Sequence, residues 1–183
     1  MNIEQKHILL KTARDAVMAA VSGKKPVRGS SDNAELNAHC GCFVTLKNKG
    51  ELRGCIGQFV SDKPLIELVS QMAVASSTGD SRFFGEPITQ KEVKDLDIEI
   101  SVLSPLKKTT DPLSLRLGID GIYIKKGYAS GCFLPQVATE TGWSKEEFLS
   151  YCCSHKAGLK ADAWKDKNTE VYLFTAEILE EEK

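Results

Sequence analysis

Apolar residues recur every three or four positions in several stretches of the chain, which is the spacing of amphipathic helices. The longest stretch covers residues 3–22, where Asn2 and Gln5 fit a capping box at the first turn. A second stretch runs from Pro64 to Thr78, with proline suited to the first turn of the helix. Shorter helices are predicted over residues 89–96, 135–142 and 145–157, the last with a capping box at Ser144 and Glu147.

Alternation of apolar and polar residues predicts strands, because successive side chains of a strand point to opposite faces. Residues 40–47 and 51–57 alternate on either side of Asn48-Lys49-Gly50. That tripeptide suits a three-residue hairpin loop with Gly50 in the left-handed conformation. Further strands are predicted over residues 97–103, 119–125, 128–134 and 170–179, the middle two forming a second hairpin.

The three-residue loop fixes the expected register of the first hairpin. It pairs Lys47 with Glu51, Thr45 with Arg53, and Phe43 with Cys55. Four apolar side chains then share one face: Val44, Leu46, Leu52 and Ile56. Arg53 and Cys55 project together to the other face.

Helices and strands are interspersed, and tight hairpins imply antiparallel pairing. We therefore expect an α+β fold with a mostly antiparallel sheet flanked by helices. The length suits a single domain over residues 1–183. The two hairpins are expected in separate lobes, with a cleft between them.

The composition is that of a globular protein, with 42% hydrophobic and 27% charged residues. A net charge of −1 favours neither nucleic acid nor a membrane surface as a partner. No apolar run approaches the roughly 20 residues that a membrane helix needs. Because the first residues also lack the apolar core of a signal peptide, we expect a cytoplasmic protein with its six cysteines reduced.

One stretch, residues 51–58, carries candidate chemistry. Cys55 lies between two glycines, and Arg53 precedes it by two positions. A neighbouring cation favours the thiolate, the nucleophilic form of cysteine. A catalytic thiol also needs a positioned base. The histidines of the chain are His7, His39 and His155, and none of them lies near Cys55 in the sequence. Cys55 is therefore a candidate nucleophile, with a small buried strand residue as the alternative.

Two groups of residues invite a metal hypothesis. His39, Cys40 and Cys42 form the first, and Cys152-Cys153 with His155 forms the second. Neither has the paired spacing of zinc sites, and adjacent cysteines on a helix point about 100° apart. The chain also lacks phosphate-loop and dinucleotide fingerprints. We expect no metal and no cofactor.

The hexapeptide Leu52-Arg53-Gly54-Cys55-Ile56-Gly57 resembles the hallmark of the AMME-region candidate protein family. The likeness extends over about residues 5 to 180. Where the family usually has Asp-Pro-Arg-Phe, this chain has Asp80-Ser81-Arg82-Phe83. Other matching stretches are Phe43–Leu46, Asp97–Pro105, Phe133–Ala138, Gly142-Trp143, Lys156–Leu159 and Trp164.

The resemblance implies a two-lobed α+β fold but no reaction. Bacterial and archaeal members are similar to protein A of the AmmeMemoRadiSam system. That likeness implies a Memo-like protein and a radical SAM protein as partners.

Two function classes follow from these observations. In the first, an enzyme or enzyme subunit handles a small molecule in a cleft around Arg53 and Cys55, the candidate catalytic residues. The candidate ligand-binding residues are Gly54, Gly57, Arg82 and Glu99. In the second class, a non-catalytic adaptor presents the hexapeptide surface to a protein partner.

Overall fold

The computed structural model describes residues 1–26 and 28–181, and the chain divides into two compact units. Unit 1 comprises residues 1–103 and the segment from Glu177, and unit 2 comprises residues 104–176. Each unit has its own four-stranded sheet with antiparallel pairs, accompanied by helices. The predicted α+β class is confirmed, while the expected cleft stays a prediction.

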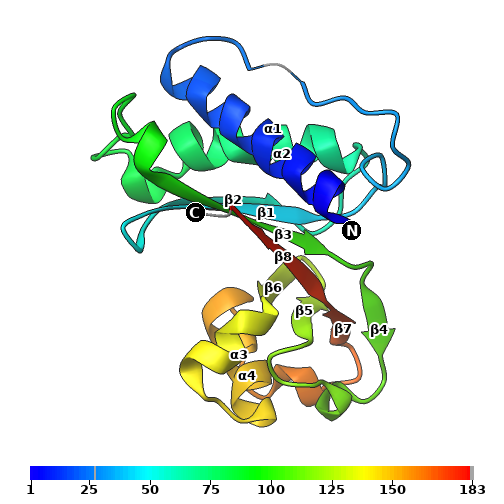
Figure 1. Cartoon of the computed structure of the whole chain (residues 1–183). Helices are drawn as coiled ribbons and strands as arrows, with labels where there is room; N and C mark the ends of the chain where they lie inside the picture. Colours follow the sequence, from blue (N-terminus) through cyan, green and yellow to red (C-terminus); the bar gives the residue numbers. More distant parts are fainter. Residues whose placement is uncertain (27, 182–183) are drawn as a thin grey trace. The chain divides into compact units, whose positions relative to one another are not determined.

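In unit 1, helices cover one face of the sheet (Figure 1). Its strand order is β2-β1-β3-β8, so β2 is an edge strand. A π-helical turn, Ala75–Gly79, continues the second helix, and a 3₁₀ turn, Ser81–Phe83, follows. In chain order the main elements are α1 (Ile3–Val21), β1 (Cys42–Asn48), β2 (Glu51–Gln58), α2 (Leu65–Val74), β3 (Leu96–Leu103) and β8 (Ala176–Glu180).

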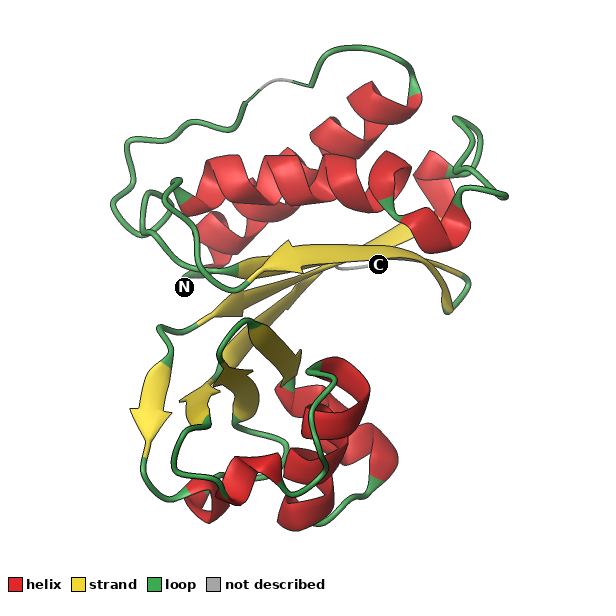
Figure 2. Cartoon of the chain, turned by 180° about the vertical axis from the view of Figure 1, so that it is seen from behind, coloured by secondary structure: helices red, strands yellow, loops and turns green. Residues whose placement is uncertain are grey.

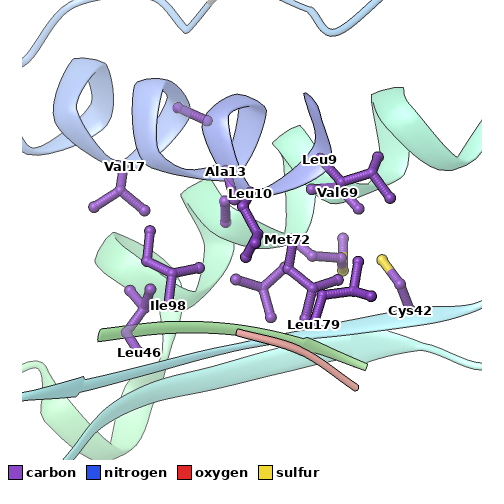
Figure 3. Packing of buried hydrophobic residues seen from close by; sticks show 14 of the residues in the cluster. Leu9, Leu10, Ala13, Val17, Cys42, Leu46, Val69, Met72, Ile98 and Leu179 are labelled. Atoms are coloured by element: carbon purple, nitrogen blue, oxygen red, sulfur yellow. The ribbon is translucent and has the colours of Figure 1, made fainter. Parts of the chain in front are cut away.

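The core of unit 1 lies between its two helices and its sheet (Figure 3). The predicted capping box is present at the start of α1, where Asn2 and Gln5 bond reciprocally. Apolar side chains at helical spacing on α1 and α2 meet alternate side chains of the strands. Fully buried members include Leu9, Ala13, Val17, Leu46, Val69 and Ile98.

The long polar segment before the first hairpin packs against the start of α2. Leu36 is completely buried in the core of unit 1. The amides of Leu65 and Ile66 donate to the carbonyls of Ala38 and Leu36, both at 3.0 Å. Backbone of this segment thus satisfies donors that the first turn of a helix leaves without partners.

Unit 2 is a small sheet with helices packed against it (Figure 2). Its strand order is β4-β7-β5-β6. The predicted capping box at Ser144 and Glu147 is present. In chain order the main elements are β4 (Lys107–Thr109), β5 (Gly121–Lys126), β6 (Ala129–Phe133), α3 (Pro135–Thr141), α4 (Lys145–Tyr151) and β7 (Glu170–Phe174).

Two predicted elements differ from the structure. The single strand expected over 170–179 is two strands, β7 and β8, that belong to different sheets. Alternation continues across Thr175, so the sequence pattern does not reveal this change of sheet. The helix expected over 89–96 is only a 3₁₀ turn, Val93–Asp95. None of the helices in the described residues is long and apolar enough to cross a membrane.

Candidate functional site

The first hairpin is tighter than its sequence predicts. Its turn has two residues, Lys49 and Gly50, with φ of 50° and 84°. Such a turn pairs Asn48 with Glu51 and Lys47 with Leu52. The register then shifts, and Leu46 pairs with Gly54. The predicted pairing of Lys47 with Glu51 is wrong.

A β-bulge at Arg53 explains the register shift. Arg53 is the extra residue of β2, with no partner in the register to β1. Beyond the bulge, Cys55 pairs with Thr45, so the predicted partners of Arg53 and Cys55 are both wrong. Leu52 is 37% exposed, because the two-residue turn puts it opposite Lys47 instead of in the core.

Arg53 and Cys55 consequently have separate surroundings, which corrects the shared face that we predicted. The guanidinium of Arg53 binds Glu92, with Nε 2.6 Å from Oε1. It also donates from Nη2 to the Glu86 carbonyl at 2.9 Å. The Cys55 thiol instead accepts a hydrogen bond from the Thr45 hydroxyl at 3.2 Å. Arg53 is therefore not the activating cation of this thiol.

Gly54 lets the π-helical turn after α2 approach the sheet. A Cβ on Gly54 would lie 2.0 Å from the Ser76 carbonyl oxygen. The Ser76 hydroxyl accepts from the Ile56 amide at 2.9 Å and donates to the Val44 carbonyl at 2.7 Å. Gly54 and Ser76 together fix how this turn sits on β2 and β1.

Gly57 has a comparable steric role. A Cβ there would lie 2.3 Å from the ring of Phe43, its cross-strand partner. The Phe43 ring in turn packs edge-on against Phe59, with centroids 5.0 Å apart. The close approaches that we expected for a ligand at Gly54 and Gly57 are made by the protein itself.

The backbone of Cys55 is held by the pair of Asp80 and Arg82. The Cys55 amide donates to Asp80 Oδ2 at 3.0 Å, and Arg82 Nη2 donates to the Cys55 carbonyl at 3.2 Å. Asp80 also accepts from Arg82 Nε and Nη2, at 2.9 and 2.6 Å. The Arg82 guanidinium lowers the pKa of Asp80 to about 2.

Glu99 shares a row of the sheet with Cys55, since both pair with Thr45 of β1. Its carboxylate binds the ammonium group of Lys47 at 2.9 Å. The candidate residues thus form two groups. Cys55 and Glu99 lie in one row, whereas Arg53 contacts the segment that follows α2.

Sequence reasoning missed Asp80, Ser76 and Glu92. Asp80 begins the stretch that matches the family's Asp-Pro-Arg-Phe, which was a usable signal. Ser76 continues the buried stripe of α2, four residues after Met72, so a polar residue there indicated a specific partner. Nothing in the sequence pattern connects Glu92 with Arg53.

Arg53 lines a hollow of about 190 Å³ that we call the Arg53 hollow. Its lining includes the apolar Phe83 and Ile88 and the acidic Asp80 and Glu86. Ser77 and Thr78 also line it, and their hydroxyls donate to the Val74 carbonyl. A second hollow of about 320 Å³ shares Arg53 with it. Cys55 lines neither of them. The arrangement offers a guanidinium for an anionic group beside aromatic and aliphatic surface.

Within residues 1–26 and 28–181, no three His, Cys, Asp or Glu side chains are placed to share a metal ion. Burial raises the pKa of the Cys132 thiol to about 11. Burial also raises the pKa of Cys40, Cys42, Cys152 and Cys153. These environments disfavour the thiolate form that metals and electrophiles require.

Cys55 is expected to react first with limiting iodoacetamide near neutral pH, about tenfold faster than Cys132. Cys55 is half-buried, as are Cys40 and Cys132, but burial raises the pKa of the other five thiols and so disfavours their thiolate. Mass spectrometry of the folded chain after brief labelling measures the order. The urea-unfolded chain is the control, in which the rates should converge. Earlier labelling of Cys40 or Cys152 would contradict the expectation.

Known proteins are similar to this chain in sequence and in fold. The sequence pattern that defines the AMMECR1 family matches residues 10–179. The chain belongs to the AMMECR1 family. The family resemblance predicted from the hexapeptide is therefore confirmed.

The relatives of this AMMECR1-family chain include archaeal proteins. A Methanothermobacter thermautotrophicus protein is 42% identical, over 95% of this chain and 93% of its own length. A Thermococcus kodakarensis protein is 40% identical, over 95% of this chain and 89% of its own. The crystal structure of the uncharacterized protein PH0010 from Pyrococcus horikoshii matches with a TM-score of 0.89 and 39% identity. That match covers 100% of this chain and 94% of the other.

Proposed function

We propose that this chain is a small-molecule-handling subunit that binds a carboxylate-bearing compound in the Arg53 hollow. The observation that carries the proposal is that one nitrogen of the Arg53 guanidinium, Nη1, has no close hydrogen-bond partner among the described residues. Glu92 and the Glu86 carbonyl hold Nε and Nη2, whereas the partner of Nη1 in the described part of the chain is the Glu86 carboxylate at 3.8 Å. The Glu86 side chain is 85% exposed, so a ligand carboxylate can take its place.

The walls of the Arg53 hollow suit the rest of such a ligand. Phe83 lies with its ring centroid 6.0 Å from the guanidinium carbon of Arg53. Pro87 and Ile88 add apolar residues to the lining. A volume of about 190 Å³ favours a metabolite smaller than the usual drug-sized ligand.

Recognition is assigned here to Arg53 and not to a nucleophilic Cys55. The thiol accepts from Thr45, a hydroxyl that is no general base, and does not line the hollow. The resemblance to protein A of the AmmeMemoRadiSam system supports a Memo-like protein and a radical SAM protein as partners. Within such a set, this chain would deliver or hold the compound on which a partner acts.

The Glu86→Gln variant tests the proposal, with benzoate as the probe and benzamide as its uncharged counterpart. Removing the competing carboxylate should tighten benzoate binding about two- to fivefold, the worth of an exposed ion pair. Benzamide binding should not change. Protein NMR titration of the full chain gives both dissociation constants.

Two further variants complete the test. Glu35→Gln is the matched control, because Glu35 is exposed and lies outside the hollow. Arg53→Gln should abolish the preference for benzoate, with thermal unfolding to verify the fold. Equal binding of benzoate and benzamide by the parent chain and by Glu86→Gln would refute the proposal.

The second candidate is a non-catalytic adaptor that presents the hexapeptide surface to a protein partner. Apolar side chains exposed in or next to β2 favour it: Leu52 is 37% exposed and Val60 71%. In this case Leu52→Asp with Val60→Asp should abolish co-purification with the Memo-like protein while leaving benzoate binding intact. Unchanged co-purification would remove the adaptor candidate.

A further inference from the structure

Unit 2 contains a hollow of its own, with a volume of about 350 Å³. All of its lining residues belong to unit 2. They come from Ser104 and β4, from the segment before β5, and from the end of β7 with the residue that follows. We call it the basic hollow, because its lining carries three cations, Lys107, Lys108 and Arg116, against one carboxylate, Asp120.

The three cations differ in what neutralises them. Lys108 binds Glu170, with Nζ 2.7 Å from Oε1. Arg116 binds Asp120. In the described part of the chain, the ammonium group of Lys107 has neither an ion pair nor a side-chain hydrogen bond. Lys107 therefore leaves an uncompensated positive charge at the basic hollow.

Arg116 is fixed in position by Asp120. Its Nε and Nη2 donate to the carboxylate at 2.9 and 2.8 Å, and its backbone amide donates to the same group at 2.8 Å. The Asp120 side chain is only 8% exposed, whereas that of Arg116 is 63% exposed. Nη1 is the terminal nitrogen that Asp120 does not use, so an oriented donor group remains for a ligand.

A third donor comes from Thr175. Its backbone amide donates to the Ser104 hydroxyl oxygen at 2.9 Å, which anchors the residue at the hollow. Thr175 is exposed, and among residues 1–26 and 28–181 its own hydroxyl has no hydrogen-bond partner. Three donors from separate segments, Lys107, Arg116 and Thr175, thus border one basic hollow.

We propose that the basic hollow binds the phosphate group of a small phosphorylated compound. A phosphate monoester offers three terminal oxygens, which match the three donors, and its negative charge meets the uncompensated charge of Lys107. A carboxylate offers two oxygens and one charge. The remainder of the compound lies against Leu173, an apolar residue of the lining that is only half-buried. This site is independent of the Arg53 hollow, which belongs to unit 1.

Titration of the full chain with inorganic phosphate and with phenyl phosphate tests this site. Protein NMR should show both probes shifting the resonances of Lys107, Arg116 and Thr175, with phenyl phosphate the tighter because of its apolar ring. Potassium chloride at matched ionic strength should leave these resonances in place. Equal shifts with chloride would mean general screening, and the proposal would fall.

Lys107→Gln is the decisive variant, because Lys107 is exposed and its backbone pairing with Leu173 survives the change. We expect it to weaken phenyl phosphate binding about tenfold, as for the loss of a hydrogen bond to a charged group. Lys160→Gln is the matched control, since Lys160 is exposed in the same unit but away from the hollow. Equal effects of the two substitutions would overturn the proposal.

Discussion

Replacing Gly54 by alanine is expected to lower the free energy of unfolding by about 3 kcal/mol, the upper part of the range for overpacking. The added Cβ would lie 2.0 Å from the Ser76 carbonyl oxygen and 2.9 Å from its carbonyl carbon. Both are backbone atoms, so no side-chain rotation relieves the overlap. The π-helical turn must move away from β2, which lengthens the hydrogen bonds of the Ser76 hydroxyl to Ile56 and Val44.

Urea unfolding followed by circular dichroism measures this loss. Gly79→Ala is the matched control in the same turn, because a Cβ on Gly79 would have nothing within 4 Å and the φ of this residue is not positive. That substitution should change stability by less than about 0.5 kcal/mol. A Gly54→Ala chain as stable as Gly79→Ala would show that the turn does not rest on β2 as described.

The second large effect is expected for Asp80→Asn, at about 2 kcal/mol near neutral pH. The Asp80 pKa is lowered from 3.8 to about 2, and each pKa unit corresponds to about 1.4 kcal/mol. Its carboxylate accepts hydrogen bonds from Cys55 and Arg82 with both oxygens. The amide of asparagine keeps one acceptor and turns a donor toward these donors.

The loss of stability caused by Asp80→Asn should become smaller as the pH falls. Because the folded-state pKa is the lower one, Asp80 stabilises the fold fully above about pH 5 and loses this contribution as pH falls toward 2. The difference between the parent chain and the variant should therefore shrink over that interval. Thermal unfolding at a series of pH values measures it.

Asp15→Asn serves as the control for Asp80→Asn. Asp15 forms an exposed i,i+4 pair with Lys11 on α1, with side chains 53% and 64% exposed. Such pairs contribute about 0.3–0.5 kcal/mol. A loss for Asp80→Asn no larger than that of Asp15→Asn, or one that grows at low pH, would contradict the role given to Asp80.

Local patterns in the sequence predicted most elements of the fold. The capping boxes at Asn2 and Ser144 and the alternation over 97–103 correspond to α1, α4 and β3. These features depend on neighbours within a few residues, which is the range over which periodicity and capping act. The same reasoning assigned the chain to the correct fold class.

The hairpin register shows where local reasoning stopped. Asn48-Lys49-Gly50 is compatible with a three-residue loop, but Lys49 adopts a positive φ and the turn has two residues. The bulge at Arg53 then restores the alignment of Ile56 with Val44 in the core. Arg53 in the bulge binds Glu92, and the nearby Ile56 amide donates to Ser76; both partners lie far along the chain from β2.

The candidate catalytic residues are close in sequence but have separate surroundings in the fold. Arg53 lines the Arg53 hollow, whereas Cys55 pairs with Thr45 and does not line it. The bulge at Arg53 adds one residue to β2, so the two side chains do not share a face. Side-chain direction alternates along a strand, so any single-residue shift reverses which neighbours face each other. The alternation within the hairpin does not reveal this shift. The extra residue is Arg53, and a polar residue at that position fits the expected pattern with or without a bulge.

The pair of Asp80 and Arg82 also governs how β2 meets other molecules. As an edge strand, β2 presents backbone donors and acceptors on which a further strand can add. At Cys55 both groups are already taken, the amide by Asp80 and the carbonyl by Arg82. Two side chains thus block intermolecular β-sheet growth at the middle of this strand. Their ion pair protects the chain against edge-to-edge aggregation.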